Sequence, residues 1–259
     1  MNEGQLQKAL SSLPFGELRY FDTIGSTNDE ALTWASQDAP DLSMIVADEQ
    51  TAGRGRSSRK WFTSLGSALA LSLILRPSAA ELAYPARITG LGALAIADSL
   101  RALGLTPKIK WPNDVLINRR KVAGILVESV WTGDALTSSV LGMGVNVLKE
   151  STPLSDGLLF PSTSIETELG QPLDRVELLK EIISALIKWR KNLGEDGFIH
   201  AWEDALAFHG EQVQVIRDQD EPLIGKLIGL ELDGSLIIHA IDGNFQNIQF
   251  GEIHLRPAL

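Results

Sequence analysis

Apolar residues gather in short, strand-length runs over the first ~150 residues of the chain. We expect strands at 18–22, 43–49, 67–75, 121–130 and 138–147, and shorter strand pieces at 108–114 and 115–117, broken by Pro112. Between them, the stretch "EQTAGRGRSSRKW" (49–61) holds Gly53 and Gly55, which disfavour a helix. This stretch is therefore predicted to be a loop.

Helical spacing of apolar residues marks four other segments. They cover roughly 27–36, 84–104, 174–194 and 197–210. The 174–194 helix is predicted to be capped by Asp174 and Glu177 and to end at Gly194. Thr27 and Glu30 have capping-box spacing, which makes Thr27 the expected N-cap of the first helix. Residues 150–172 are rich in Ser, Pro and Thr and are expected to form a loop.

After Gly210 the pattern changes to short strands, with "DG" turns at 233–234 and 242–243. The strand-like segments are "EQVQVI", "LIGKLIGLEL", "SLIIHAI" and "FQNIQFGEIHL". A run of strands without helices suggests a small β-barrel. We therefore expect two domains, 1–208 and 209–259.

Composition narrows the class of protein. The 259 residues are 44% hydrophobic, as in a globular protein, and the net charge of −10 disfavours non-specific nucleic-acid binding. The N-terminus lacks a signal-peptide pattern, and the longest apolar run (68–75) is too short to cross a bilayer. With no cysteine, the expected location is the cytoplasm.

The 49–61 loop concentrates positive charge in this acidic chain. Arg54, Arg56, Arg59 and Lys60 surround glycines that free backbone N–H groups, and Trp61 offers a flat face for a base. These features are typical of a phosphate or adenylate clamp. An ordinary solvated basic loop is the alternative.

Two further places hold candidate chemistry. Lys110 and Lys121 flank a predicted hairpin and could face one cavity, where a buried cation would need an anionic partner. Alternatively, Lys121 lies exposed at a strand end, and Asn113 and Asp114 are turn residues. The segment "GSTND" either caps a helix or forms a polar pocket for a small neutral group. The four histidines lack metal-ligand spacing, so no metal ligands are assigned.

Taken together and in order, "STN", "GRGRSSRKW", "KWPND", "KVAGILVE" and "GMGVNV" resemble the biotin protein ligases, strongly over residues 18–148. The resemblance implies an α+β fold: a mixed-sheet catalytic domain related to class II tRNA synthetases, then a small C-terminal SH3-like β-barrel. It also implies that biotin and Mg·ATP form biotinoyl-5'-AMP, and that biotin is then transferred to one lysine of a biotin carboxyl carrier protein.

The resemblance also assigns roles to residues of this chain. Lys121 and Arg56 would be catalytic. The biotin-binding residues would be Ser26, Thr27, Asn28, Gln50, Arg54, Gly55, Arg56 and Lys121. The residues that hold ATP (with its Mg²⁺) would be Gly53, Arg54, Arg56, Trp61, Lys110, Asn113, Lys121 and Asn146.

Two departures from the family pattern qualify these expectations. Ser57-Ser58 stands where the family commonly has Arg-Gly or similar, which leaves the tightness of adenylate retention open. About seventeen residues precede the first predicted strand, too few for the DNA-binding domain of some relatives, so we expect no DNA partner. A homodimer is possible.

Two other functions compete with this interpretation. A lipoate protein ligase has a related fold, but its nearly apolar substrate ring would not need Ser, Thr, Asn and Gln around it. A non-enzymatic RNA-binding module could use the "RGR" segment and the terminal barrel, although the acidic net charge argues against it.

Overall fold

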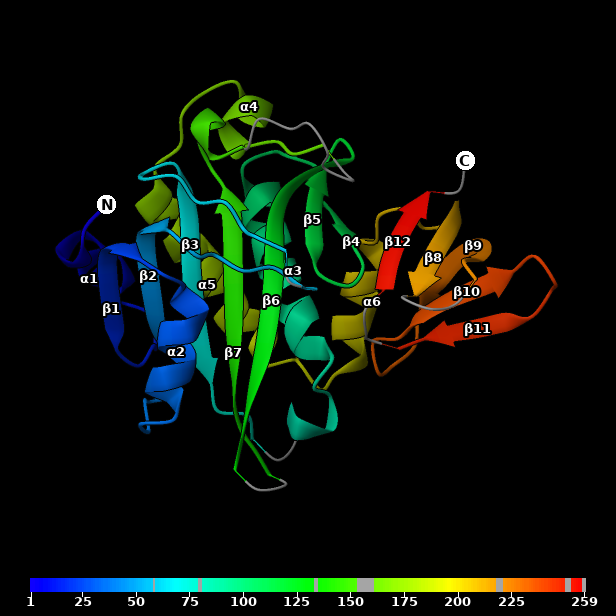
Figure 1. The fold of residues 1–259 in the computed structure, drawn as a ribbon, viewed down its shortest axis with the longest axis horizontal. Helices are drawn as coiled ribbons and strands as arrows, with labels where there is room; N and C mark the ends of the chain where they lie inside the picture. Colours follow the sequence, from blue (N-terminus) through cyan, green and yellow to red (C-terminus); the bar gives the residue numbers. More distant parts are fainter. Residues whose placement is uncertain are drawn as a thin grey trace.

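The computed structural model describes residues 1–57, 59–78, 81–132, 135–152, 161–217, 221–249 and 253–257. Within these ranges, seven strands form one mixed sheet in the order β1-β2-β3-β7-β6-β5-β4 (Figure 1). β1 and β2 are parallel, and the other neighbours are antiparallel. The strands are β1 (Leu18–Ile24), β2 (Ser43–Gln50), β3 (Ala68–Leu75), β4 (Lys108–Lys110), β5 (Asp114–Ile117), β6 (Arg120–Thr132) and β7 (Ala135–Asn146).

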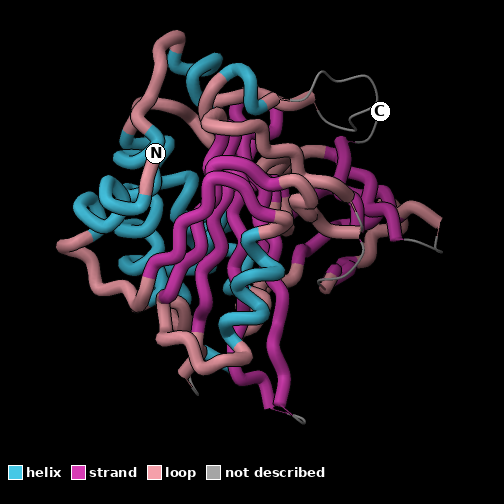
Figure 2. The backbone as a smooth tube through the Cα atoms, turned by 60° about the vertical axis from the view of Figure 1, so that its left-hand side comes forward, coloured by secondary structure: helices cyan, strands magenta, loops and turns pink. Residues whose placement is uncertain are grey.

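The centre of this sheet is buried on both faces. All eight residues of β3 are buried, as its almost unbroken apolar sequence "ALALSLIL" requires. Figure 2 shows the strands running together between helices, with the C-terminal strands as a separate group. The helices are α1 (Glu3–Leu10), α2 (Thr27–Ala35), α3 (Arg87–Ala102), α4 (Ile165–Leu169), α5 (Arg175–Arg190) and α6 (Asp196–Asp204), with short 3-10 turns η1 (Glu81–Ala83) and η2 (Lys149–Ser151).

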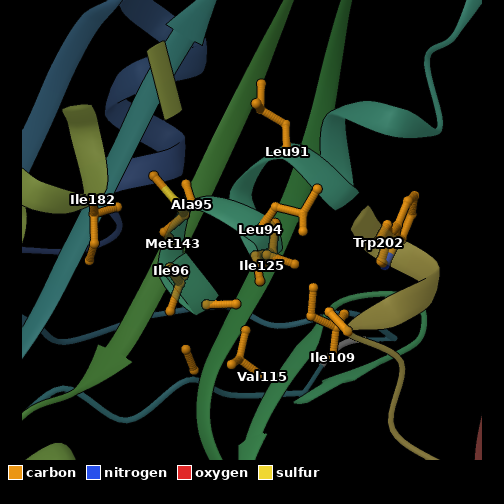
Figure 3. Packing of buried hydrophobic residues seen from close by; sticks show 14 of the residues in the cluster. Leu91, Leu94, Ala95, Ile96, Ile109, Val115, Ile125, Met143, Ile182 and Trp202 are labelled. Carbon is orange, nitrogen blue, oxygen red and sulfur yellow. The ribbon is translucent and has the colours of Figure 1, made fainter. Parts of the chain in front are cut away.

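The main hydrophobic core lies between the sheet and helices α3 and α5. Leu91 and Leu94 of α3 pack with Ile125 of β6 and Met143 of β7, and Ile182 of α5 belongs to the same cluster (Figure 3). Burying such side chains contributes about 1.5–3 kcal/mol each. The core thus fixes the strands that carry the polar residues of the opposite face.

Helix α2 covers part of the opposite face of the sheet, in front of β2 and β3 in Figure 1, and also contacts β7. A second, smaller apolar cluster forms beneath it, where Ala31 and Trp34 meet Ile45, Ile74 and Val140. The start of α2, which carries the polar residues of "GSTND", is thereby held over the middle of β3, β6 and β7.

The C-terminal strands form a separate antiparallel sheet in the order β11-β10-β9-β8-β12. They are β8 (Gln212–Arg217), β9 (Leu223–Leu230), β10 (Leu236–Ala240), β11 (Phe245–Ile248) and β12 (Ile253–Pro257). The mixed sheet with its helices and the separate antiparallel sheet fit the predicted α+β fold class with a small C-terminal barrel.

Arg87 at the start of α3 connects the segment before α6 with the β9–β10 turn of the C-terminal sheet. Its side chain is buried and donates hydrogen bonds to the carbonyls of Leu193, Glu195 and Leu232, the last in the β9–β10 turn. Trp111 Nε1 adds a bond of 3.0 Å to the Gly234 carbonyl. Four hydrogen bonds from one guanidinium therefore help to hold the small sheet against the rest of the chain.

The structure corrects several predicted elements. α1 was not predicted, and α4 forms within the expected 150–172 loop, of which 153–160 lie outside the described residues. Ser164 caps α4 by accepting from the Thr167 N–H. Asp174 caps α5 as predicted, but α5 ends at Arg190, before Gly194. The predicted last strand is two strands, β11 and β12. Among the described residues, no helix has the length and apolar character needed to cross a membrane.

Candidate active site

The first residues of α2 form a polar cluster with the end of β2. The predicted capping role of Thr27 is wrong, because Ser26 is the N-cap residue and Thr27 begins the helix. The Thr27 N–H and hydroxyl instead both donate to Gln50 Oε1, at 2.9 and 3.1 Å. Gln50 Nε2 in turn donates to Thr63 Oγ1 at 3.2 Å. This cluster brings together Ser26, Thr27 and Gln50 as the sequence predicts.

Asn28 lies deeper in the same cluster, with its amide engaged by the protein. Its Oδ1 accepts a bond of 2.6 Å from Ser72 Oγ on β3, and its Nδ2 donates to Glu128 Oε2 on β6 at 2.8 Å. Gly142 of β7 allows this approach, since an added Cβ there would overlap with the Asn28 amide. Asn28 therefore braces the pocket from behind Thr27.

The β2–β3 connection, residues 51–67, crosses the front of β7 and β6 (Figure 1), and we call it the binding loop. It folds back on itself through bonds from Gly55 N to the Arg59 carbonyl and from Trp61 N to the Gly53 carbonyl. Ser58 lies outside the described residues. The predicted loop is confirmed, and its backbone is ordered by its own hydrogen bonds.

Two arginines of the binding loop reach the sheet. Arg54 makes a two-pronged bond to the Glu128 carboxylate, 2.9 Å to each oxygen, and a 2.5 Å bond to Asp29. The hydrogen bond that Arg54 donates to Glu128 raises the pKa of Arg54, so the guanidinium keeps its charge. Arg56 donates to Asn113 Oδ1 at 3.3 Å.

Trp61 lies flat against the glycines of β6 and β7. An added Cβ at Gly144 would overlap with its indole ring, and one at Gly124 would come within 3.1 Å of it. The Lys121 ammonium lies 5.4 Å from the ring centroid, a cation–π distance. Trp61 Nε1 is buried and has no hydrogen-bond partner among the described residues.

Lys110 and Lys121 meet at one carboxylate, as the predicted shared cavity requires. Asp114 Oδ1 is 2.6 Å from Lys121 Nζ, and Oδ2 is 3.2 Å from Lys110 Nζ. Burial raises the pKa of Asp114, but the two ammonium groups outweigh it and lower the pKa to about 2. Burial lowers the pKa of Lys110, and Asp114 opposes that effect. Asp114 is therefore ionised and is the anionic partner that the buried lysines need.

Asn146 and Lys121 are both tied to the chain around Ser162. Lys121 N donates to the Pro161 carbonyl, Thr163 N donates to the Lys121 carbonyl, and Asn146 Nδ2 donates to the Thr163 carbonyl at 3.1 Å. The predicted site residues thus share one face of the sheet. Within the described ranges, no three His, Cys, Asp or Glu side chains converge as metal ligands.

Sequence reasoning missed Ser72, Glu128, Asp29 and Thr63 as parts of the site, and treated Asp114 as a turn residue. A signal existed for two of them. Ser72 interrupts the apolar run "ALALSLIL", and Glu128 closes the apolar strand "VAGILVE". A polar residue inside a buried strand must find a partner, which marks it as part of a polar network.

The chain is similar to known proteins of one family. The Biotin/lipoate A/B protein ligase family matches residues 20–146. The Biotin--[acetyl-CoA-carboxylase] ligase of Paracoccus denitrificans is 36% identical over 84% of this chain and 92% of its own. The Bifunctional ligase/repressor BirA of Bacillus spizizenii is 33% identical, over 94% of this chain and 76% of its own.

A solved structure extends the likeness to the fold. The biotin protein ligase from Aquifex aeolicus in complex with biotin and ATP superposes with a TM-score of 0.81 and 27% identity. The match covers 94% of this chain and 100% of that one. From the ordered motifs, the shared fold and these identities, it follows that this chain belongs to the biotin protein ligase family.

Proposed function

We propose that the protein activates biotin with ATP and transfers it to a lysine of a biotin carboxyl carrier protein. The observation that carries this proposal is the convergence of Lys110, Lys121 and Arg56 beside Asn113 and Asp114, next to a neutral polar cluster. The cations suit an anionic reaction centre, and the neutral cluster around Thr27 suits an uncharged head group such as a ureido ring.

In the first step, a biotin carboxylate oxygen attacks the α-phosphorus of ATP. A new O–P bond forms, the bond to the pyrophosphate oxygen breaks, and pyrophosphate leaves with the electron pair. Two anions must meet, so fixed cations at Lys121 and Arg56 reduce their repulsion and stabilise the charge on the phosphoryl oxygens. Mg²⁺ enters as part of the substrate Mg·ATP, since Mg²⁺ usually binds together with substrate phosphates.

In the second step, the neutral amine of a carrier lysine attacks the carbonyl carbon of biotinoyl-5'-AMP. The C–N bond forms, the bond to the phosphate oxygen breaks, AMP leaves with the electron pair, and the amine loses a proton. The binding loop shields the adenylate from water until this step, because the mixed anhydride is prone to hydrolysis.

Individual residues have proposed roles within this scheme. Biotin is contacted by Ser26, Thr27, Gln50 and the Gly55 backbone. Asn28 orients Thr27 through Ser72. Trp61 offers its free buried Nε1 donor and ring face to the adenylate, and Gly53 lets the loop backbone approach it closely. Lys110 and Asn113 serve the phosphates, and Asn146 lies beside the nucleotide. The domains 1–208 and 209–259 are retained as a proposed division.

The setting of the reaction is likewise proposed. The enzyme works in the cytoplasm, where ATP is made, and without a DNA partner. Pairing of two copies through an exposed sheet edge would give a homodimer.

Biotin-dependent exchange of labelled pyrophosphate into ATP tests the proposal. We expect exchange with biotin and none with lipoate. Lys121→Ala is expected to lower the exchange rate roughly a hundredfold or more, as loss of one group stabilising transition-state charge does. Lys180→Ala, which removes a lysine paired with Glu177 on α5, is the matched control and keeps the wild-type rate. Exchange with lipoate alone would overturn the proposal.

A further inference from the structure

Glu128 serves two parts of the site with one carboxylate. Its Oε1 accepts from Arg54 of the binding loop, and its Oε2 accepts both from Arg54 and from Asn28 Nδ2. The distances are 2.9, 2.9 and 2.8 Å. Arg54 and Asn28 lie 74 and 100 positions from Glu128 in the sequence, so this strand residue is where loop and pocket meet.

From Glu128 a chain of hydrogen bonds runs through the pocket to the other end of the binding loop. Asn28 Oδ1 accepts from Ser72 Oγ, which also lies 2.8 Å from the hydroxyl oxygen of Thr27. Thr27 donates to Gln50, and Gln50 donates to Thr63. Both the beginning of the loop at Arg54 and its end at Thr63 are therefore fastened to one buried polar network.

An ordinary surface ion pair would contribute little, at a median of about 0–1 kcal/mol. The Glu128–Arg54 contact differs in two respects. It is two-pronged, which fixes direction as well as distance, and Glu128 is only 24% exposed. Glu128 also accepts the shorter hydrogen bond of the buried Asn28 amide. The other contact of Asn28 Nδ2, to the Leu126 carbonyl, is 3.4 Å long.

We propose that Glu128 is a positioning residue that couples the binding loop to the pocket, the polar cluster of Thr27, Asn28, Gln50 and Ser72. Asp29 is the second carboxylate that holds Arg54. When Glu128 holds Arg54, the loop backbone around Gly53 and Gly55 lies over the pocket, and Asn28 and Thr27 keep their orientation. The coupling of loop and pocket stands on geometry alone. Its effect on biotin rests on the proposed function.

Glu128→Gln tests the coupling with almost no change of shape. A glutamine has an NH2 group in place of one carboxylate oxygen and carries no charge, so it cannot form the two-pronged, charge-assisted bond to Arg54. Asp29→Asn weakens the hold on Arg54 without touching Asn28. Glu30→Gln is the matched control, because Glu30 lies next to Asp29 on α2 but pairs at 2.7 Å with Arg19 of β1 instead of with the loop.

Limited trypsin digestion of the ligand-free protein reads the loop directly, since cleavage after Arg54, Arg56, Arg59 and Lys60 reports local opening. We expect loop cleavage to be roughly tenfold faster in Glu128→Gln. This factor corresponds to a loss of ~1.4 kcal/mol in the free energy that keeps the loop closed. The increase is expected to be smaller in Asp29→Asn and absent in Glu30→Gln.

Exchange kinetics provide the second readout. Glu128→Gln is expected to raise the KM for biotin roughly tenfold while kcat stays within about twofold of wild type. The inference would be overturned if Glu128→Gln had the same loop cleavage rate and the same KM for biotin as the wild type. A decrease in kcat of Glu128→Gln without a change in KM would also overturn the inference. So would a loop cleavage rate that rises as much in Glu30→Gln as in Glu128→Gln. If Glu128→Gln does not fold, Asp29→Asn replaces it as the test. A loop cleavage rate in Asp29→Asn equal to that of the wild type would then overturn the inference.

The two proposals fail in different ways. If wild-type protein shows no biotin-dependent exchange, the proposed function is wrong, and the digestion still tests the fastening. If the wild type exchanges normally but the loop variants behave like it, only the fastening is wrong.

Discussion

Lys121 and Asp114 form an ion pair of 2.6 Å between β6 and β5, and Lys110 approaches the other oxygen of the same carboxylate at 3.2 Å. Two cations thus share one anion, which leaves a net positive charge at the place where anionic substrates would meet. Asp114 holds both ammonium groups in position while neutralising only one of them.

This pair predicts a pH-dependent contribution to stability. The pKa of Asp114 is lowered to about 2, so its contribution is complete above the unfolded value of about 3.9 and is lost as pH falls through about 2. Asp114→Asn is expected to lower the free energy of unfolding by on the order of 2 kcal/mol at neutral pH. Urea titrations of both proteins from pH 7 to pH 2 should show the difference shrinking below about pH 4. A difference that does not depend on pH would contradict the account.

Gly144 is predicted to be irreplaceable because Trp61 lies on it. A methyl group at this position would overlap with the indole ring, so Gly144→Ala must move Trp61 off the sheet. We expect the KM for biotin or ATP to rise tenfold or more, since a displacement of about 1 Å can cost a hundredfold in rate. Gly197→Ala in α6, where nothing lies within 4 Å of the added methyl group, is the control. Equal kinetics in the two variants would show that Trp61 has no part in the site.

Arg87 is predicted to hold the two domains together. Arg87→Leu removes the donor from three backbone carbonyls, and we expect the free energy of unfolding to fall by about 2–5 kcal/mol. Urea unfolding followed by tryptophan fluorescence measures the change. Arg101→Leu, at a more exposed arginine on the same helix, should stay within about 0.5 kcal/mol of wild type. A similar small change in Arg87→Leu would contradict the docking role.

Arg56 is predicted to retain the adenylate. Arg56→Gly removes the side chain that reaches Asn113 across the site, so biotinoyl-5'-AMP should escape before transfer. The expected result is biotin on lysines of a bystander protein added without carrier, detected by streptavidin blotting. Arg56→Lys keeps the positive charge but loses the planar guanidinium with its two parallel donors. It should therefore label the bystander protein less than Arg56→Gly and more than the wild type. An Arg56→Gly variant that leaves the bystander protein unlabelled would refute this role.

The sequence predicted those parts of the structure that depend on local pattern. Strand-length apolar runs located all seven strands of the large sheet, and the glycines around Arg54 located the binding loop. The predicted convergence of Lys110 and Lys121 also held, because β4 and β6 flank β5 and both lysines reach Asp114 at the start of β5.

The parts that it did not predict depend on contacts between distant residues. Thr27 was expected to cap its own helix, but Gln50, 23 positions away, offers a better acceptor to both its N–H and its hydroxyl. Glu128 looked like the end of a strand, and its partners Asn28 and Arg54 become visible only when β6 lies beside α2 and the loop. Local pattern carries no information about such partners, although a polar residue in an apolar strand indicates that one exists.

The most direct test of the central claim is a crystal structure of the protein with biotin and a non-hydrolysable ATP analogue. The account predicts that the biotin carboxylate and the α-phosphate lie together within hydrogen-bonding distance of Lys121, with the Arg54–Arg56 segment over them and the head group beside Thr27. Both ligands bound elsewhere, with Lys121 and that segment facing solvent, would contradict it.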